Sequence, residues 1–231
     1  MTVLYILAFL LLSYFLGSIP SGLVIGKLCK GIDIREHGSK NTGATNTIRV
    51  LGFRYGIFAF LFDAFKGGLV MLILVTFELE DFYLLTVGDT TLDTLVLYGL
   101  AAVVGHVFPI YIGFKGGKAV ATSAGVVIAL EPFAGLVTLS IFLFMVKKTR
   151  YVSLASTVAA LSVIIMFTLR IIIAAFGLFR SGEMGFFFVR EADSAWTFVL
   201  ELLTINLMAL LIFIRHRMNY KRLRDGTEFQ V

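Results

Sequence analysis

The chain has 231 residues, of which 58% are hydrophobic and only 15% are charged, and its mean hydropathy is +0.93. A soluble domain averages about 25% charged residues, so this composition excludes an ordinary soluble globule and predicts a protein embedded in lipid. The net charge is +5, and the single cysteine, Cys29, excludes an intrachain disulfide.

Apolar runs long enough to cross a bilayer recur along the chain. A hydrocarbon core of about 30 Å needs roughly 20 apolar residues in a helix. Such runs cover residues 2–25, 53–77, 92–114, 151–176 and 195–214. Between the third and fourth runs, a longer apolar stretch is interrupted by Glu131-Pro132. Because proline breaks a helix, this stretch is predicted to form two short helices, 119–130 and 133–146. We therefore expect an all-α integral membrane protein, one domain over residues 1–231, with about seven transmembrane helices.

Charge along the chain predicts the orientation in the membrane. Lys and Arg outnumber Asp and Glu in four segments: 27–54, 115–118, 147–150 and 215–228. The connections 78–93 and 177–195 are acidic instead. Because cytoplasmic loops collect Lys and Arg, the N-terminus is predicted to lie outside and the C-terminus in the cytoplasm. This alternation works only if the chain turns at Glu131-Pro132.

The first basic loop contains a polar stretch, 38–49, in which small hydroxyl and amide residues surround two glycines. Such a backbone folds tightly, presents N–H groups to an anion and leads into the positive end of a short helix. An arginine at its end offers a planar fork to a phosphate. The stretch runs from Gly38 to Arg49, and the short helix is expected to begin near residues 41–45. A capped turn without a ligand explains the stretch equally well.

The second segment, 114–122, places two lysines around two glycines immediately before an apolar helix. Glycines allow close backbone approach, the helix start supplies N–H donors, and the lysines supply charge. The candidate phosphate-binding residues are Lys115, Gly116, Gly117 and Lys118. The stretch is not a nucleotide-binding P-loop, because its spacing is one residue short and Ala119 stands where Ser or Thr would hold magnesium. The alternative is a flexible turn with orienting lysines.

The third segment, 215–224, is a basic cluster directly after the last apolar run. If the helix continues, His216 and Asn219 share one face because they are three residues apart. A juxtamembrane basic cluster is ordinarily an anchor for anionic headgroups, and on local evidence that explanation is favoured. All three segments, however, are predicted on the same side of the membrane.

Charged residues inside the apolar runs are expected to be paired or functional. Asp63 and Lys66 are three residues apart and are predicted to form a structural ion pair. Arg170 and Glu201 are expected to snorkel or pair. His106 is interpreted as a hydrogen-bonded packing residue rather than a base. The histidines are dispersed and form no metal-ligand pattern, so no metal is expected.

In this order and on this topology, the three segments resemble the bacterial acyl-phosphate:glycerol-3-phosphate acyltransferases, the PlsY family. The stretches 17–22 and 150–156 are similar to that family too. The resemblance implies a membrane enzyme of the bacterial inner membrane with its active site at the cytoplasmic face. It implies acyl transfer from acyl phosphate to the sn-1 hydroxyl of glycerol-3-phosphate, giving lysophosphatidic acid and phosphate. Lys40 and Ala119 depart from the family pattern, where glycine is common.

Carried over residue by residue, the resemblance divides the candidates into two groups. The catalytic residues it implies are Ser39, Arg49, Lys118, His216 and Asn219. The substrate phosphate-binding residues it implies are Asn41, Thr45, Asn46, Lys115, Gly116, Gly117, Ser153 and Ser156. The expected partners are acyl phosphate, glycerol-3-phosphate and membrane lipid, with no cofactor, no nucleic acid and no obligate protein partner. A transporter for small phosphorylated anions is the alternative function, and acyl-CoA or acyl carrier protein are alternative donors.

Overall fold

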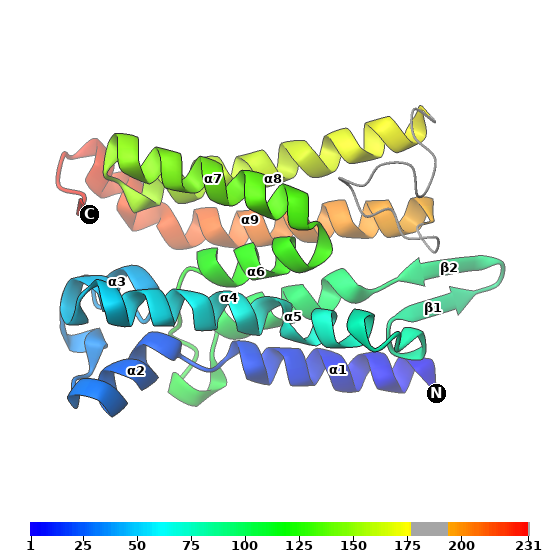
Figure 1. Cartoon of the computed structure of the whole chain (residues 1–231), viewed down its shortest axis with the longest axis horizontal. Helices are drawn as coiled ribbons and strands as arrows, with labels where there is room; N and C mark the ends of the chain where they lie inside the picture. The colour runs from blue at the N-terminus through cyan, green and yellow to red at the C-terminus, as the bar shows by residue number, and fades with distance from the viewer. Residues whose placement is uncertain (177–193, 231) are drawn as a thin grey trace.

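The computed structural model describes residues 1–176 and 194–230, and these residues are predominantly helical (Figure 1). The α-helices are α1 Thr2–Gly17, α2 Ser21–Lys30, α3 Ala44–Leu51, α4 Phe53–Thr76, α5 Leu95–Val107, α6 Val120–Leu130, α7 Pro132–Thr149, α8 Val152–Ala175 and α9 Ala195–Arg224. Short 3-10 turns are η1 Ile34–Glu36, η2 Glu80–Phe82 and η3 Ile110–Ile112, and two strands, β1 Leu84–Val87 and β2 Thr90–Asp93, form a hairpin.

Five of the described helices are long and apolar enough to cross a bilayer: α4, α5 extended through η3, α7, α8 and α9. A sixth crossing is possible where α1 and α2 form a pair bent by 44°. The apolar run 2–25 is therefore divided into two helices: α1 ends at Gly17, and Pro20, which cannot continue the backbone hydrogen bonds of a helix, lies at the break. The remaining predicted span is α6, whose 11 residues reach only about 16 Å at 1.5 Å per residue.

The predicted interruption at Glu131-Pro132 is confirmed, since α6 ends at Leu130 and α7 begins at Pro132. Proline is favoured at the first position of a helix, where its missing N–H has no partner to lose. Glu131 is buried at this turn, and its carboxylate lies 3.1 Å from Arg170. The same guanidinium donates to Glu201 at 2.6 Å, so the expected pairing of Arg170 ties α8 to α9 and to the α6–α7 turn.

The hairpin corrects one prediction. The run 92–114 was expected to be helical from its start, but residue 92 belongs to β2, and α5 begins at Leu95. The strands pair antiparallel with Thr86 opposite Thr91, and Gly88 turns the chain with a φ of +61°. A left-handed turn residue of this kind suits the tight connection of a hairpin.

The helices place the three motif segments at one end of the molecule. In Figure 1, α2, α3, the start of α6 and the C-terminus gather at that end, while the N-terminus and the β1–β2 hairpin lie at the other. The acidic connection 78–93 is therefore at the end opposite the basic motifs, as the charge pattern predicted. Most of the other acidic connection, 177–193, lies outside the described residues.

A buried ionic network fixes the break between α1 and α2 against α4. Asp63 and Lys66 pair at 2.7 Å, which confirms the predicted ion pair, and both side chains are almost fully buried. Ser21 donates to Asp63 at 2.7 Å, and the Lys66 ammonium donates to the carbonyl of Ile19 at 2.6 Å. Because an unpaired charge is very unfavourable in this environment, the network holds α2 and the first motif loop at a fixed position.

Candidate active site

A polar cavity of about 100 Å³ opens at the end where the motif segments meet. Each of the three segments contributes to its wall. Of the sequence-predicted residues, the wall contains Ser39, Asn41, Thr45, Asn46, Arg49, Lys118, Ser153, Ser156, His216 and Asn219. Lys115, Gly116 and Gly117 are not in the wall. The structure also adds residues that the sequence did not mark as site residues, above all Asp63, His106 and Glu228.

Asn46, in the first turn of α3, organises the first loop. Its side-chain oxygen accepts from the backbone N–H of Ser39 at 2.7 Å and from the Ser39 hydroxyl at 3.1 Å. Its amide nitrogen donates to the carbonyls of Ile34 at 2.8 Å and Asn41 at 2.9 Å. Asn46 is 1% exposed, and these bonds engage both its amide oxygen and its amide nitrogen. Asn46 therefore has a structural role in the cavity wall. The loop it holds presents Ser39 to the cavity.

Arg49 lies one turn further along α3 and points its guanidinium toward the C-terminal tail. It lies 4.9 Å from the ring centroid of Phe229. Its Nε is buried and has no hydrogen-bond partner among the described residues. Burial lowers the pKa of Arg49, yet an arginine in a protein stays protonated. Arg49 therefore brings a positive charge into the wall.

The second loop is built differently from the expectation. The N–H groups of Gly116 and Gly117 donate to the carbonyls of Val107 at 3.2 Å and His106 at 3.1 Å. Their carbonyls accept from the Arg215 guanidinium, at 2.6 Å for Gly116 and 3.1 Å for Gly117. Both glycines are thus engaged on both sides by the protein itself. Their amides face the end of α5 rather than the cavity.

The two glycines are required by close packing against α5. A Cβ on Gly116 would lie 2.1 Å from the carbonyl oxygen of His106, and a Cβ on Gly117 would lie 2.1 Å from Nε2 of the same histidine. The His106 ring is fixed from its other side, since its Nδ1 lies 3.4 Å from Asp63. The loop therefore rests on a histidine anchored to the buried ionic network, which agrees with the packing interpretation of His106.

Lys118 is the residue that this loop delivers to the cavity. Its ammonium donates to the side-chain oxygen of Asn219 at 2.5 Å. Burial lowers the pKa of Lys118 to about 8, and the nearby guanidiniums of Arg222, Arg49 and Arg215 act in the same direction. The lysine is followed by the N-terminal turn of α6, whose first residues also line the wall. Lys118 and the positive end of α6 both favour an anion here.

Helix α9 extends ten residues beyond the predicted end at 214, and this extension carries His216 and Asn219 on one face, as predicted. The Nδ1 of His216 lies 2.8 Å from the carbonyl oxygen of Ile212. Because a carbonyl only accepts, Nδ1 carries the proton in the neutral ring, and Nε2 is the basic nitrogen. Lys115, in the second loop, is exposed and does not belong to the cavity wall.

Glu228 is the main site residue that sequence reasoning missed. Its carboxylate accepts from Asn219 at 2.6 Å, from Ser153 at 3.0 Å and from Arg222 at 2.8 Å. Burial raises the pKa of Glu228, but these hydrogen bonds outweigh it and the net shift is downward. The only signal in the sequence was an acidic residue after a strongly basic cluster. Ser156, by contrast, turns its hydroxyl back to the carbonyl of Val152 at 2.7 Å.

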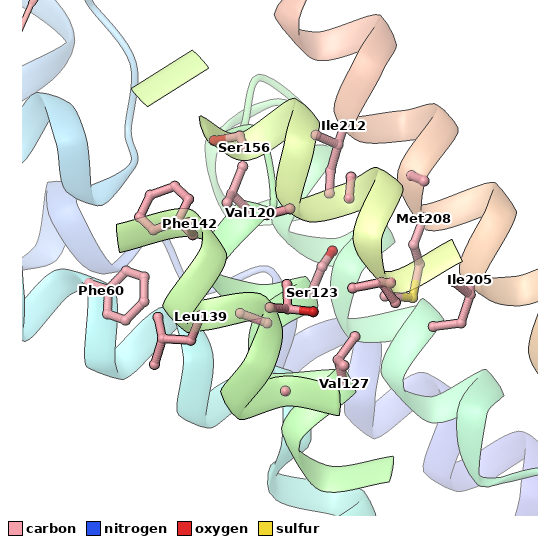
Figure 2. A pocket seen from close by; sticks show the side chains of 17 residues that line it. Phe60, Val120, Ser123, Val127, Leu139, Phe142, Ser156, Ile205, Met208 and Ile212 are labelled. Carbon is pink, nitrogen blue, oxygen red and sulfur yellow. The ribbon is translucent and has the colours of Figure 1, made fainter. Parts of the chain in front are cut away.

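An apolar cavity of about 60 Å³ (Figure 2) shares part of its wall with the polar one. It is lined chiefly by aliphatic and aromatic side chains from α6, α7, α8 and α9, among them Val127, Leu139, Met208 and Ile212. Four residues belong to both walls: Phe60, Val120, Phe142 and Ser156. The two cavities therefore form a polar head and an apolar extension that share one boundary.

Known proteins match this chain over nearly its whole length. The family model described as glycerol-3-phosphate acyltransferase matches residues 7–226. A glycerol-3-phosphate acyltransferase of Acholeplasma laidlawii is 43% identical over 231 residues, which is 100% of this chain and 95% of that protein. One of Fusobacterium nucleatum is 40% identical over 220 residues, which is 95% of each chain.

Solved structures match the fold as well. The crystal structure of PlsY, an integral membrane glycerol 3-phosphate acyltransferase, in its glycerol 3-phosphate form has a TM-score of 0.77 and 35% identity, covering 98% of this chain and 95% of that one. Its lysophosphatidic acid form has a TM-score of 0.74 and 35% identity, covering 97% and 94%. The chain belongs to the glycerol-3-phosphate acyltransferase family of integral membrane proteins, the PlsY family.

Proposed function

We propose that this glycerol-3-phosphate acyltransferase takes its acyl group from acyl phosphate and transfers it to the sn-1 hydroxyl of glycerol-3-phosphate. The products are lysophosphatidic acid and inorganic phosphate. The observation that carries the proposal is the shared boundary of the two cavities, where a polar pocket containing Arg49 and Lys118 meets an apolar one. A phosphorylated headgroup and a fatty chain both find matching surroundings there, and the reacting carbonyl would lie between them.

The polar cavity suits two phosphate groups. Arg49 and Lys118 bring positive charge from separate loops, and the first turns of α3 and α6 add backbone N–H donors. Charge grows on the departing phosphate as the acyl–oxygen bond breaks, and preorganised cations at that place lower the barrier. Ser39, held by Asn46, is placed to orient the substrates and so to convert a two-body encounter into a positioned one.

The chemical step needs no covalent enzyme intermediate. Acyl phosphate is a mixed anhydride whose phosphate already leaves readily. The sn-1 oxygen attacks the acyl carbon, the bond from that carbon to the phosphate oxygen breaks, and the hydroxyl proton passes either to a phosphate oxygen or to Nε2 of His216. The hydrogen bond from Nδ1 of His216 to Ile212 leaves Nε2 free to accept a proton.

The site is proposed to lie at the cytoplasmic face of a bacterial inner membrane. The basic segments and the cavity share one end of the molecule, and basic loops favour the cytoplasm. Glycerol-3-phosphate would enter from water and the acyl chain from lipid. A transporter would instead need charged groups lining a path through the membrane. The cations of the site gather at one end, and the buried cations of the spans, Lys66 and Arg170, are paired with carboxylates. A non-catalytic lipid-binding protein could also hold a headgroup phosphate with Lys118, but it would form no acylated product.

A comparison of acyl donors tests the proposal. Purified protein in detergent would be given labelled glycerol-3-phosphate with palmitoyl phosphate, palmitoyl-CoA or palmitoyl acyl carrier protein, and the lysophosphatidic acid formed would be quantified. We expect product with palmitoyl phosphate only. Equal product from palmitoyl-CoA would overturn the donor assignment. Absence of product from all three donors, with glycerol-3-phosphate still bound, would overturn the enzymatic function.

A further inference from the structure

The last described residues of the chain fold back over the polar cavity. After α9, the N–H of Thr227 donates to the carbonyl of Arg222 at 2.8 Å, and Glu228 joins Ser153 and Asn219 as described above. Beyond it, the amide of Gln230 donates to the hydroxyl of Tyr151 at 3.1 Å. These bonds fix the tail on both sides of Phe229. The hydrogen bonds of the tail therefore determine where the Phe229 ring lies.

Two guanidiniums from different parts of the fold lie against this one ring. Arg49, from α3, is 4.9 Å from the Phe229 centroid, and Arg222, from α9, is 5.4 Å from it. A cation within about 6 Å of an aromatic ring centroid is attracted by the ring quadrupole. Like charges this close would otherwise repel one another. The ring offers each of them a favourable contact.

The two arginines are held in different ways. The Nε–H of Arg222 donates to Glu228 at 2.8 Å, so one of the N–H donors of Arg222 is already engaged by a carboxylate. Arg49 has no ion pair with a described carboxylate within 4.0 Å, and its buried Nε has no hydrogen-bond partner among the described residues. A guanidinium has five N–H donors, and a ring contact holds it through its charge without consuming any of them.

We propose that Phe229 is a positioning residue for Arg49: its ring fixes the guanidinium in the cavity wall and leaves the N–H donors for a substrate phosphate. The role attributed to Arg49 rests on the proposed function. A carboxylate in direct contact would fix Arg49 equally well, but it would compete with the phosphate for the same donors. The Glu228 carboxylate is close enough to act on the charge of Arg49 but forms no ion pair with it within 4.0 Å. The aromatic face holds the guanidinium without using its N–H donors.

The proposal predicts that aromatic character, rather than apolar volume, matters at position 229. Phe229→Leu keeps an apolar side chain and removes the ring, whereas Phe229→Tyr and Phe229→Trp keep a ring. Loss of one cation–π contact is expected to weaken glycerol-3-phosphate and inorganic phosphate binding by roughly 3- to 30-fold. The Tyr and Trp variants should rescue the wild-type affinity to within about twofold.

The experiment uses the full chain in detergent. Isothermal titration would give the affinity for glycerol-3-phosphate and for inorganic phosphate, and acyl transfer assays would give kcat and KM. Because Phe229 acts through Arg49, we expect Phe229→Leu to change the kcat/KM of an Arg49→Gln background by less than about twofold. A thermal melt of each variant would check that the fold is retained.

Each outcome decides the proposal. Wild-type affinity in Phe229→Leu, equal losses in the Leu, Tyr and Trp variants, or the same loss with and without Arg49 would each overturn it. If the wild-type protein forms no lysophosphatidic acid, the proposed function fails, yet the phosphate affinities of the four proteins still decide whether the ring positions Arg49.

Discussion

The two loops at the cavity, 38–49 and 114–122, both contain glycines beside polar or basic residues, but their glycines have different structural roles. In the first loop, Asn46 closes the backbone on itself and turns Ser39 into the cavity. In the second, Gly116 and Gly117 bring the backbone against His106 and do not reach the cavity wall. A glycine pair beside lysines therefore serves close packing here, and the ligand-facing elements are the residues that follow it.

Lysine replacement in the second loop gives the largest expected effect. Lys118→Ala should reduce kcat/KM by about 100- to 1,000-fold, because removal of one preorganised electrostatic contact to developing charge has an effect of that size. Lys115 is exposed and outside the wall, so Lys115→Ala is the matched control and should stay within about threefold of wild type. Steady-state acyl transfer measures both. Equal losses of kcat/KM in the two variants would indicate that the whole loop, and not Lys118 alone, binds phosphate.

Replacing one glycine in each loop with alanine tests how tightly the two loops are packed. Gly117→Ala forces a Cβ to 2.1 Å from the His106 ring, whereas Gly43→Ala meets only the Asn41 side chain at 3.3 Å. Overpacking of this kind destabilises by about 1–3 kcal/mol, which lowers the Tm of a protein of this size by roughly 2–12 °C. Thermal unfolding in detergent should show that loss for Gly117→Ala and a much smaller one for Gly43→Ala. A reversed order would mean that the first loop is the tightly packed one.

The pH dependence of turnover tests the burial of Lys118. Its pKa is lowered to about 8, chiefly by burial, so the free enzyme loses this positive charge as the pH rises through that value. Because kcat/KM reports the ionisation of the free enzyme, it should fall on an alkaline limb with a midpoint near 8. Lys118→Arg keeps the charge at every accessible pH and should remove the limb, even where its absolute rate is lower. A limb at the same midpoint in that variant would belong to another group.

Much of the fold could be predicted because it depends on local patterns. Apolar run length indicated the long helices, and Pro132 indicated the turn that brings Lys118 and the end of α7 to the same side. The hairpin was not predicted because β1 and β2 have only four residues each. The β-branched residues on both sides of Gly88-Asp89 were nevertheless a signal for it. Strand signals this short are easily attributed to the end of an adjacent apolar run.

The site was harder to predict than the fold. Residues in the same motif could be grouped from the sequence, but their orientation depends on partners elsewhere in the chain. Ser153 and Glu228 are 75 positions apart and meet only because the tail reverses after α9. The glycines of the second loop could not be assigned to packing without knowing that His106, held by Asp63, lies beneath them. Distances between elements, rather than residue types, decided these roles.

The smallest expected effects come from two positions, one in each loop, where the resemblance described above leads us to expect glycine. Lys40 and Ala119 adopt left-handed backbone conformations, with φ of +59° and +58°. An L-residue with a Cβ pays about 1–2 kcal/mol for this conformation, while glycine loses more entropy on folding, by roughly 0.5–1 kcal/mol. Lys40→Gly removes this strain at an exposed position and should raise the Tm by about 1–4 °C. Ala119→Gly relieves the same strain but also removes a methyl group that is 1% exposed and packed in the core. Because a buried methyl group is worth about 0.8 kcal/mol, we expect little net change in Tm for Ala119→Gly. Thermal unfolding of the two variants measures both effects, and an equal gain in the two loops would show that the Ala119 methyl group contributes nothing to stability.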